Sequence, residues 1–201
     1  LPFGLFTNIG QFRQIDVMRE QVPKLVVGVH YSHNSGISSR RGRYSGRLIY
    51  LNNNDEESLP DYFKTGIDFL FKYKGLSALG EYVKSSATVP SDITQRVRND
   101  GSISTSFLVN DAQNVDAYVK GRMMLGEAYN FQLGYLFKNN ISLDARYTHL
   151  KADNNSFMNN ATFYNRPNYY TIGLTKLAGR NYGFKVQGSL TFIDGSLGIN
   201  H

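Results

Sequence analysis

The chain has no cysteine and no tryptophan among its 201 residues, and it contains no long apolar run. The absence of cysteine excludes disulfide bonds and thiolate metal sites. A transmembrane helix needs about 20 consecutive apolar residues, and no stretch of the sequence approaches that length. The first residue is Leu1 rather than a start methionine, and no signal peptide precedes it. We therefore expect the chain to be processed or to be a fragment.

The composition combines a positive net charge with many aromatic residues. The formal net charge is +6 at pH 7, which predicts attraction to anions. Lysine and arginine are dispersed along the chain, and this argues against a nucleic-acid partner. The 14 tyrosines and 13 phenylalanines suit the aromatic girdles of outer-membrane barrels. A mean hydropathy of −0.37 agrees with such a barrel, because lumen residues dilute the apolar ones.

Two long stretches, 62–73 and 182–193, alternate between apolar and polar residues. One face of the first stretch holds Phe63, Thr65, Ile67, Phe69, Phe71 and Tyr73. One face of the second holds Tyr182, Phe184, Val186, Leu190 and Phe192. A period of two over this length predicts strands with one apolar and one polar face. Sandwich strands usually hold about 5–6 residues and membrane-barrel strands about 9–11, so the pattern favours an all-β transmembrane antiparallel up-and-down β-barrel over a soluble sandwich.

Nine strands are predicted along the chain, at residues 3–10, 24–33, 44–51, 62–73, 76–86, 127–137, 141–151, 168–177 and 182–193. Short connections at 74–75, 138–140 and 179–181 contain Gly or Asn, which the positive φ of tight turns favours. The longer, polar connections are 52–61, 87–126 and 152–167. Short and long connections alternate, as in a barrel with tight periplasmic turns and long external loops.

This alternation gives every predicted strand a direction. If the short turns are periplasmic, strand 182–193 runs outward and connection 34–43 lies on the periplasmic side. Barrels of this kind begin and end on the periplasmic side, so we expect a further inward strand after His201. Nine strands are also an odd number and few for a porin. Residues 1–201 are therefore expected to form a partial outer-membrane β-barrel domain, the C-terminal half of a larger barrel, with no separate soluble domain.

Several short segments occur in an order that carries a family resemblance. They are PFGLFT at 2–7, DVMRE at 16–20, PKL at 23–25, FKYKGLS at 71–77, GEY at 80–82, GYLF at 134–137, ARYT at 145–148, NYYTIGL at 168–174 and KVQ at 185–187. In this order they resemble the second half of the phosphate-selective porin O/P family of Gram-negative outer membranes. The resemblance implies a barrel of roughly 16–18 strands around an aqueous channel, trimeric assembly and passage of small anions. The chain lacks the first half and the last strand of that pattern.

Alternation also sorts the charged residues by face. The basic residues predicted to face the lumen are Lys24, Lys64, Lys72, Arg146 and Lys185, with Lys120 and Arg122 from the segment before 127–137. The acidic residues predicted there are Asp68, Glu81 and Asp144. An excess of Lys and Arg lining a pore lowers the barrier for anions, and a low-dielectric wall focuses that field. The alternative for each residue is simple solvation of the lumen and pairing with the acids.

The densest basic cluster comprises Arg40, Arg41, Arg43 and Arg47. Guanidinium groups hold phosphate bidentately, which fits the same anion pathway. Arg47 is in phase with Ser45 and is predicted to point inward as part of that pathway. For the other three we favour a solvated connection, or a contact with anionic lipid or peptidoglycan.

Motifs of enzymes are missing from the sequence. It contains no G-x-S-x-G elbow, no P-loop and no H-E-x-x-H, so we predict no catalytic residue, no cofactor and no metal site. Asp16 and Glu20, with Asp153, are carboxylates that would suit a divalent ion at the external surface. Ordinary loop carboxylates are the simpler interpretation of these three residues.

The sequence as a whole favours a porin of the bacterial outer membrane. We expect it to pass phosphate-type or other small anions by passive diffusion through an electropositive lumen. The expected partners are outer-membrane lipid and lipopolysaccharide, the permeating anions, and other subunits of a homotrimer or of a larger outer-membrane complex, without nucleic acid. The alternative is a porin-like barrel that serves as a structural subunit of a larger outer-membrane complex. A soluble periplasmic sandwich that binds sugars fits the strand lengths less well.

Overall fold

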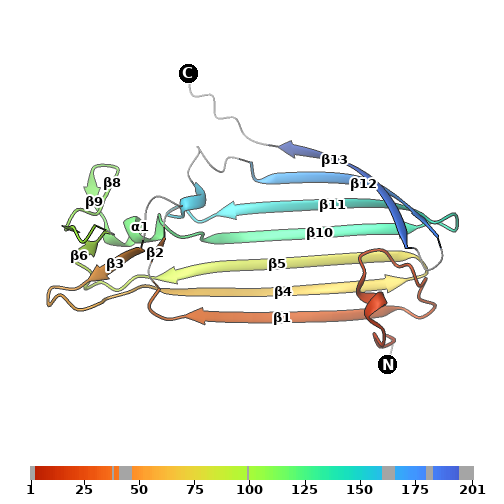
Figure 1. Cartoon of the computed structure of the whole chain (residues 1–201), viewed down its shortest axis with the longest axis horizontal. Coiled ribbons are helices and arrows are strands. Elements are labelled where there is room, and N and C mark those ends of the chain that lie inside the picture. Colours follow the sequence, from red (N-terminus) through yellow and green to blue (C-terminus); the bar gives the residue numbers. More distant parts are fainter. Residues whose placement is uncertain are drawn as a thin grey trace, which may run out of the picture.

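The computed structural model describes residues 3–37, 39–40, 47–98, 100–159, 166–179 and 183–194. Its elements are strands, two short 3-10 helices and one short α-helix, so the chain is all-β, as predicted. Seven long strands form one antiparallel sheet that runs the length of the molecule (Figure 1).

The large sheet contains, in order across it, β1 (Lys24–Asn34), β4 (Asp61–Tyr73), β5 (Leu76–Thr88), β10 (Gly126–Leu136), β11 (Ile141–Ala152), β12 (Asn168–Ala178) and β13 (Phe184–Asp194). Each strand holds 11 to 13 residues, and each neighbouring pair is antiparallel. These strands confirm seven of the nine predicted ones, although Tyr182 lies outside the described residues. β1 and β13 are the two edges, and within the described residues neither pairs with a strand on its outer side.

The tight turns of the sheet occur where Gly and Asn predicted them. Lys74 and Gly75 join β4 to β5 with φ of 47° and 91°, and Asn140 precedes β11 with φ of 61°. Gly179 follows β12 with φ of 82°. Glycine and asparagine adopt these positive φ values most readily. Because successive strands are antiparallel, these connections share one end of the sheet, called here the turn end, and the long connections leave from the opposite loop end (Figure 1).

Residues 3–10, predicted as a strand, form no strand in the structure. Only Gly4 makes a single bridge, to Lys24, and a 3-10 helix, η1 (Ile9–Phe12), follows. Asn8 caps η1 by accepting a hydrogen bond from Gly10 N at 2.7 Å. Gln11 Oε1 accepts hydrogen bonds from the backbone of Thr7 and Asn8, at 2.6 and 2.9 Å. These local side-chain bonds satisfy the backbone and replace strand pairing, which corrects the prediction.

The strand predicted at 44–51 is shorter and lies in another sheet. β3 (Arg47–Leu51) pairs with β2 (Ser39–Arg40) and β6 (Gln95–Val97), and β7 (Ile103–Ser104) completes a small sheet of four strands. Residues 44–46 lie outside the described residues. Because β1 pairs directly with β4, the chain leaves β1 and enters β4 at the loop end. This corrects the prediction that connection 34–43 lies at the same end of the sheet as the tight turns.

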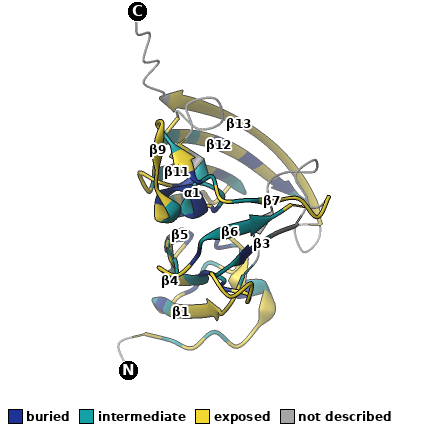
Figure 2. Ribbon diagram, turned by 90° about the vertical axis from the view of Figure 1, so that its left-hand side faces the viewer, coloured by how far each residue is buried: buried dark blue, intermediate teal, exposed yellow. Residues whose placement is uncertain are grey.

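A compact extension covers the loop end of the large sheet (Figure 2). Residues 89–125, named here the loop-end extension, include β6, β7, β8 (Leu108–Val109), β9 (Ala112–Gln113) and α1 (Val115–Lys120), and η2 (Phe157–Asn159) follows β11. The extension packs with β3 around a core of buried side chains, which are Tyr50, Ile93, Phe107, Tyr118, Val119, Met123 and Leu125. Tyr50 is fully buried, and its place in this core explains why β3 leaves the large sheet.

The N-terminal segment, residues 3–23, packs at the turn end of the large sheet (Figure 1). Ile15 and Val17 contact Leu136 of β10 and Leu177 of β12 in a second, smaller core. The segment leads into β1 and also contacts β10 and β12, which lie three and five places further across the sheet.

Candidate functional site on the polar face of the sheet

The large sheet has one face on which apolar side chains are exposed, named here the apolar face. Residues directly opposite each other on neighbouring strands point to the same side of a sheet. Phe131 of β10 lies opposite Tyr147, Tyr147 opposite Tyr170, and Tyr170 opposite Phe192. Exposed apolar residues of this face include Val29, Ile67, Leu133, Ile172, Leu174 and Leu190. An apolar surface that spans seven strands is typical of a face covered by lipid or by other protein.

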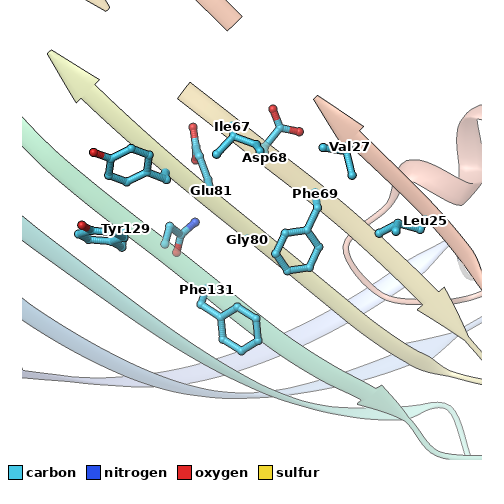
Figure 3. A pocket seen from close by; sticks show the side chains of 11 residues that line it. Leu25, Val27, Ile67, Asp68, Phe69, Gly80, Glu81, Tyr129 and Phe131 are labelled. Atoms are coloured by element: carbon cyan, nitrogen blue, oxygen red, sulfur yellow. The ribbon is translucent and has the colours of Figure 1, made fainter. Parts of the chain in front are cut away.

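Gly80 has no side chain, and the ring of Phe69 occupies the space above it on the apolar face. Phe69 on the next strand leans over it, so that a Cβ at Gly80 would lie 2.3 Å from Cε1 of the Phe69 ring. An open groove of about 440 Å³ lies beside this ring. It is lined by Leu25, Val27, Ile67, Phe69, Tyr82, Tyr129 and Phe131 (Figure 3). The groove extends the apolar character of this face from β1 to β10.

A polar border limits the apolar face at the loop end. Glu127 lies opposite Lys84 on one side and Lys151 on the other. Its Oε2 accepts hydrogen bonds from the hydroxyls of Tyr82 and Tyr129, at 3.2 and 3.1 Å. Tyrosines with an apolar ring and a hydrogen-bonded tip are typical of the boundary between an apolar and an aqueous medium.

The opposite side of the sheet, named here the polar face, carries the charged residues that alternation assigned to the lumen. Register places Lys64, Asp68 and Lys72 of β4 on this face together with Glu81, Asp144, Arg146 and Lys185 of other strands. Lys64, Arg146 and Lys185 are exposed there. Asp68 and Glu81 are also exposed and lie directly opposite each other. The exposed strand residues thus give three positive charges against two negative ones, a smaller excess than the sequence predicted.

Lys24 and Lys72 share the polar face but are buried by the N-terminal segment. Lys72 is 1% exposed, and its Nζ donates hydrogen bonds to the carbonyls of Arg13 and Ile15, the latter at 2.9 Å. Lys24 is 9% exposed and pairs with Glu20 at 3.1 Å. Both amino groups are therefore used to hold the segment, and a permeating anion would not reach them in this arrangement.

Asp16 is the centre of this docking site, and sequence reasoning missed that role. Its Oδ2 accepts hydrogen bonds from Gly75 N at 2.8 Å and from Glu20 N at 3.1 Å. Arg19 reaches across to the carbonyls of Leu136, at 2.8 Å, and of Phe137. The spacing of acid and base at 16, 20 and 24 was the available signal. Asp16 and Glu20 lie at the turn end and Asp153 follows β11 at the loop end, so the three cannot share an ion.

Lys120 and Arg122 lie in the loop-end extension, apart from the sheet residues with which the sequence grouped them. Lys120 pairs with Asp116 at 2.9 Å within α1. The guanidinium of Arg122 lies 3.7 Å from the centre of the Tyr118 ring, in a cation–π contact. Arg47 begins β3, in the small sheet, and its side chain lies outside the described residues, as do Arg41 and Arg43 entirely.

Comparison with protein-family models, with curated proteins and with solved structures gave no match to this chain. In the part of the chain that the structure describes, no helix is long and apolar enough to cross a membrane. The same residues contain no group of three or more His, Asp or Glu side chains arranged to hold a metal ion.

Proposed function

We propose that the chain is part of an outer-membrane β-barrel of the porin type and passes small anions by passive diffusion. One observation carries the proposal: a seven-stranded antiparallel sheet whose strands hold 11 to 13 residues has an exposed apolar face and a charged polar face. Membrane barrels require this combination, and strands of about 9–11 residues suffice to cross the bilayer. Further strands would pair with the open edges of β1 and β13 and complete a barrel of roughly 16–18 strands, as the porin O/P resemblance implies.

The anion preference would arise from the three exposed cations of the polar face. Lys64 lies near the loop end of β4, Arg146 in the middle of β11, and Lys185 near the turn end of β13. An anion would therefore meet a positive charge at each of three depths. Asp68 and Glu81 oppose this field, so we expect a modest preference for anions, with phosphate-type and other small anions both accepted.

The test is a reversal-potential measurement across a planar bilayer with a salt gradient. The complete barrel that contains this chain, called here the parent protein, should give single-channel steps and a potential of the sign expected for anion preference. Neutralising the three cations together, as Lys64→Gln, Arg146→Gln and Lys185→Gln, should move the potential toward zero or past it, because Asp68 and Glu81 are then the charged residues exposed on the described strands of the polar face.

A matched control neutralises three lysines on the opposite face of the sheet, Lys84→Gln, Lys151→Gln and Lys176→Gln. This control has the same change in net charge and should leave the reversal potential unchanged. Equal shifts in both triple variants would mean that net charge rather than a lined pathway sets selectivity. Absence of conductance from the correctly folded parent would contradict the porin proposal itself.

A second candidate function is a structural subunit of a larger outer-membrane complex. The specific observation in its favour is that the N-terminal segment packs over the polar face at the turn end and buries Lys72. A barrel obstructed in this way would conduct poorly. Purification from native membranes with partner proteins in fixed stoichiometry, together with absence of conductance, would favour this function over the porin.

A further inference from the structure

A polar cavity lies between the N-terminal segment and the polar face at the turn end. Its volume is about 340 Å³. The N-terminal segment contributes Arg13, Gln14, Ile15 and Val17 to its lining, and the sheet contributes Asp144, Thr175, Leu177, Lys185 and Gln187. Small-molecule sites usually have volumes of about 300–1,000 Å³ and a few convergent polar groups, and this cavity has both properties.

Two deeply buried polar side chains of the cavity have atoms without a hydrogen-bond partner. Thr175 is 1% exposed and Asp144 is 6% exposed. Within the described residues, neither Thr175 Oγ1 nor Asp144 Oδ1 has a partner, although Ser142 donates a hydrogen bond to the other oxygen of Asp144 at 3.1 Å. A buried carboxylate oxygen or hydroxyl without a partner costs about 1–3 kcal/mol, so a donor that reaches them is strongly favoured.

The charged residues that line the cavity indicate which charged group the ligand carries. Arg13 and Lys185 bring two positive charges and Asp144 one negative charge. Lys185 is close enough to Asp144 to interact with it electrostatically. A carboxylate group of the ligand would pair with the two cations, and arginine is well suited to hold a carboxylate. The amides of Gln14 and Gln187 add both donors and acceptors.

We propose that this cavity binds a small carboxylate that also carries a hydrogen-bond donor, the class of α-hydroxy and α-amino acids. The carboxylate group pairs with Arg13 and Lys185. A hydroxyl group of the ligand donates to Asp144 and accepts from the Thr175 hydroxyl, whereas an ammonium group donates to both. The bound molecule bridges the N-terminal segment and the sheet. This inference does not depend on the porin proposal, since a cavity that binds in detergent solution would do so whether or not the barrel conducts.

The experiment is isothermal titration of the purified protein in detergent, in a buffer without carboxylates, with lactate, serine and acetate as probes. Acetate has the charge but no donor group. Lactate, serine or both should bind at least about tenfold more tightly than acetate, because only they satisfy the two unpartnered oxygens. The inference would be overturned if acetate bound as tightly as lactate and serine, or if no probe bound up to about 10 mM. Either result would indicate a cavity filled by water.

Variants test the assigned contacts. Thr175→Val keeps the volume but removes the hydroxyl, and it should weaken binding about three- to tenfold, whereas Thr175→Ser should preserve it. Thr191→Val is the matched control, because Thr191 is exposed on the same face and bonds Thr171 instead. Lys185→Gln should weaken binding at least about tenfold, and Lys151→Gln on the apolar face should not. Parent-like affinity in both Thr175→Val and Lys185→Gln, with unchanged circular dichroism, would refute the proposed contacts.

Discussion

Replacing Asp16 by alanine should release the N-terminal segment from the turn end of the sheet while the sheet itself stays folded. Asp16 is 1% exposed and connects the segment to the turn between β4 and β5. The main contacts that hold the segment besides Asp16 are the Lys72 bonds to its carbonyls, the Arg19 bonds to β10, and the small core around Ile15. The change therefore acts on a local opening and not on global unfolding.

The size of the effect follows from the two backbone amides that lose their acceptor. Hydrogen bonds to a charged group contribute about 1.5–3 kcal/mol each, and Asp16 accepts one from Gly75 and one from Glu20. We expect the docked state to lose about 3–6 kcal/mol, which corresponds to a roughly 150- to 25,000-fold larger opening constant. Asp16→Asn keeps one acceptor oxygen and should have an intermediate effect.

The assay is amide hydrogen exchange of the protein in detergent, followed at residues 13–20 and at Gly75. The matched control is Asp116→Ala, because the exposed Asp116 side chain pairs with the half-buried Lys120 within α1, a contact worth about 0.3–0.5 kcal/mol. Exchange at 13–20 should accelerate in Asp16→Ala and stay at the parent rate in the control. An acceleration of less than about tenfold would refute the reasoning and assign the docking energy to the apolar contacts of Ile15 and Val17.

Two further predictions concern the sheet. Gly126→Ala should destabilise the protein by about 3 kcal/mol or more in chemical unfolding, because φ at this residue is +140° and the new Cβ would lie 2.3 Å from the carbonyl oxygen of Lys151. The control is Gly188→Ala, which should be near neutral because the space around Gly188 is open. Leu190→Arg should lower the stability of the membrane-inserted state by about 2–4 kcal/mol in a lipid-vesicle folding titration. Ser189 is the adjacent residue and lies on the polar face, so the Ser189→Arg variant should insert normally. Equal behaviour of the two variants would contradict a lipid-facing apolar face.

The seven long strands were predictable because their signal is local. Apolar and polar residues alternate along each strand, and the Gly and Asn residues of the tight turns mark where one strand ends and the next begins. The same alternation placed Lys64, Arg146 and Lys185 on one face, as the register confirms. Their role in anion passage stays a prediction, since it depends on what completes the sheet.

The remaining features depend on contacts between distant parts of the chain. Lys72 and Lys64 point to the same face of β4. Lys72 is buried because the segment that contains Ile15, 57 residues away in the sequence, packs over it, whereas Lys64 stays exposed. Tyr50 alternates like a barrel residue, yet it is buried in the loop-end extension with Phe107 and Val119. In both cases the tertiary environment overrides the strand pattern, which carries no information about what packs on each face.

The cations of the polar face fall into two groups, a buried pair that contacts the N-terminal segment and exposed residues that the porin proposal assigns to the anion pathway. The N-terminal segment covers the polar face beside Lys24 and Lys72, and its carbonyls and Glu20 provide their partners. The buried charges thereby avoid the cost of an unpaired ion and fix the segment in one register. Lys64 and Arg146 are exposed outside that footprint. Lys185, at the edge of the cavity, belongs to both regions: it is exposed toward the solvent and acts on Asp144. If the proposed anion pathway exists, a carboxylate bound to Lys185 should also weaken its preference for anions, which connects the cavity with that pathway.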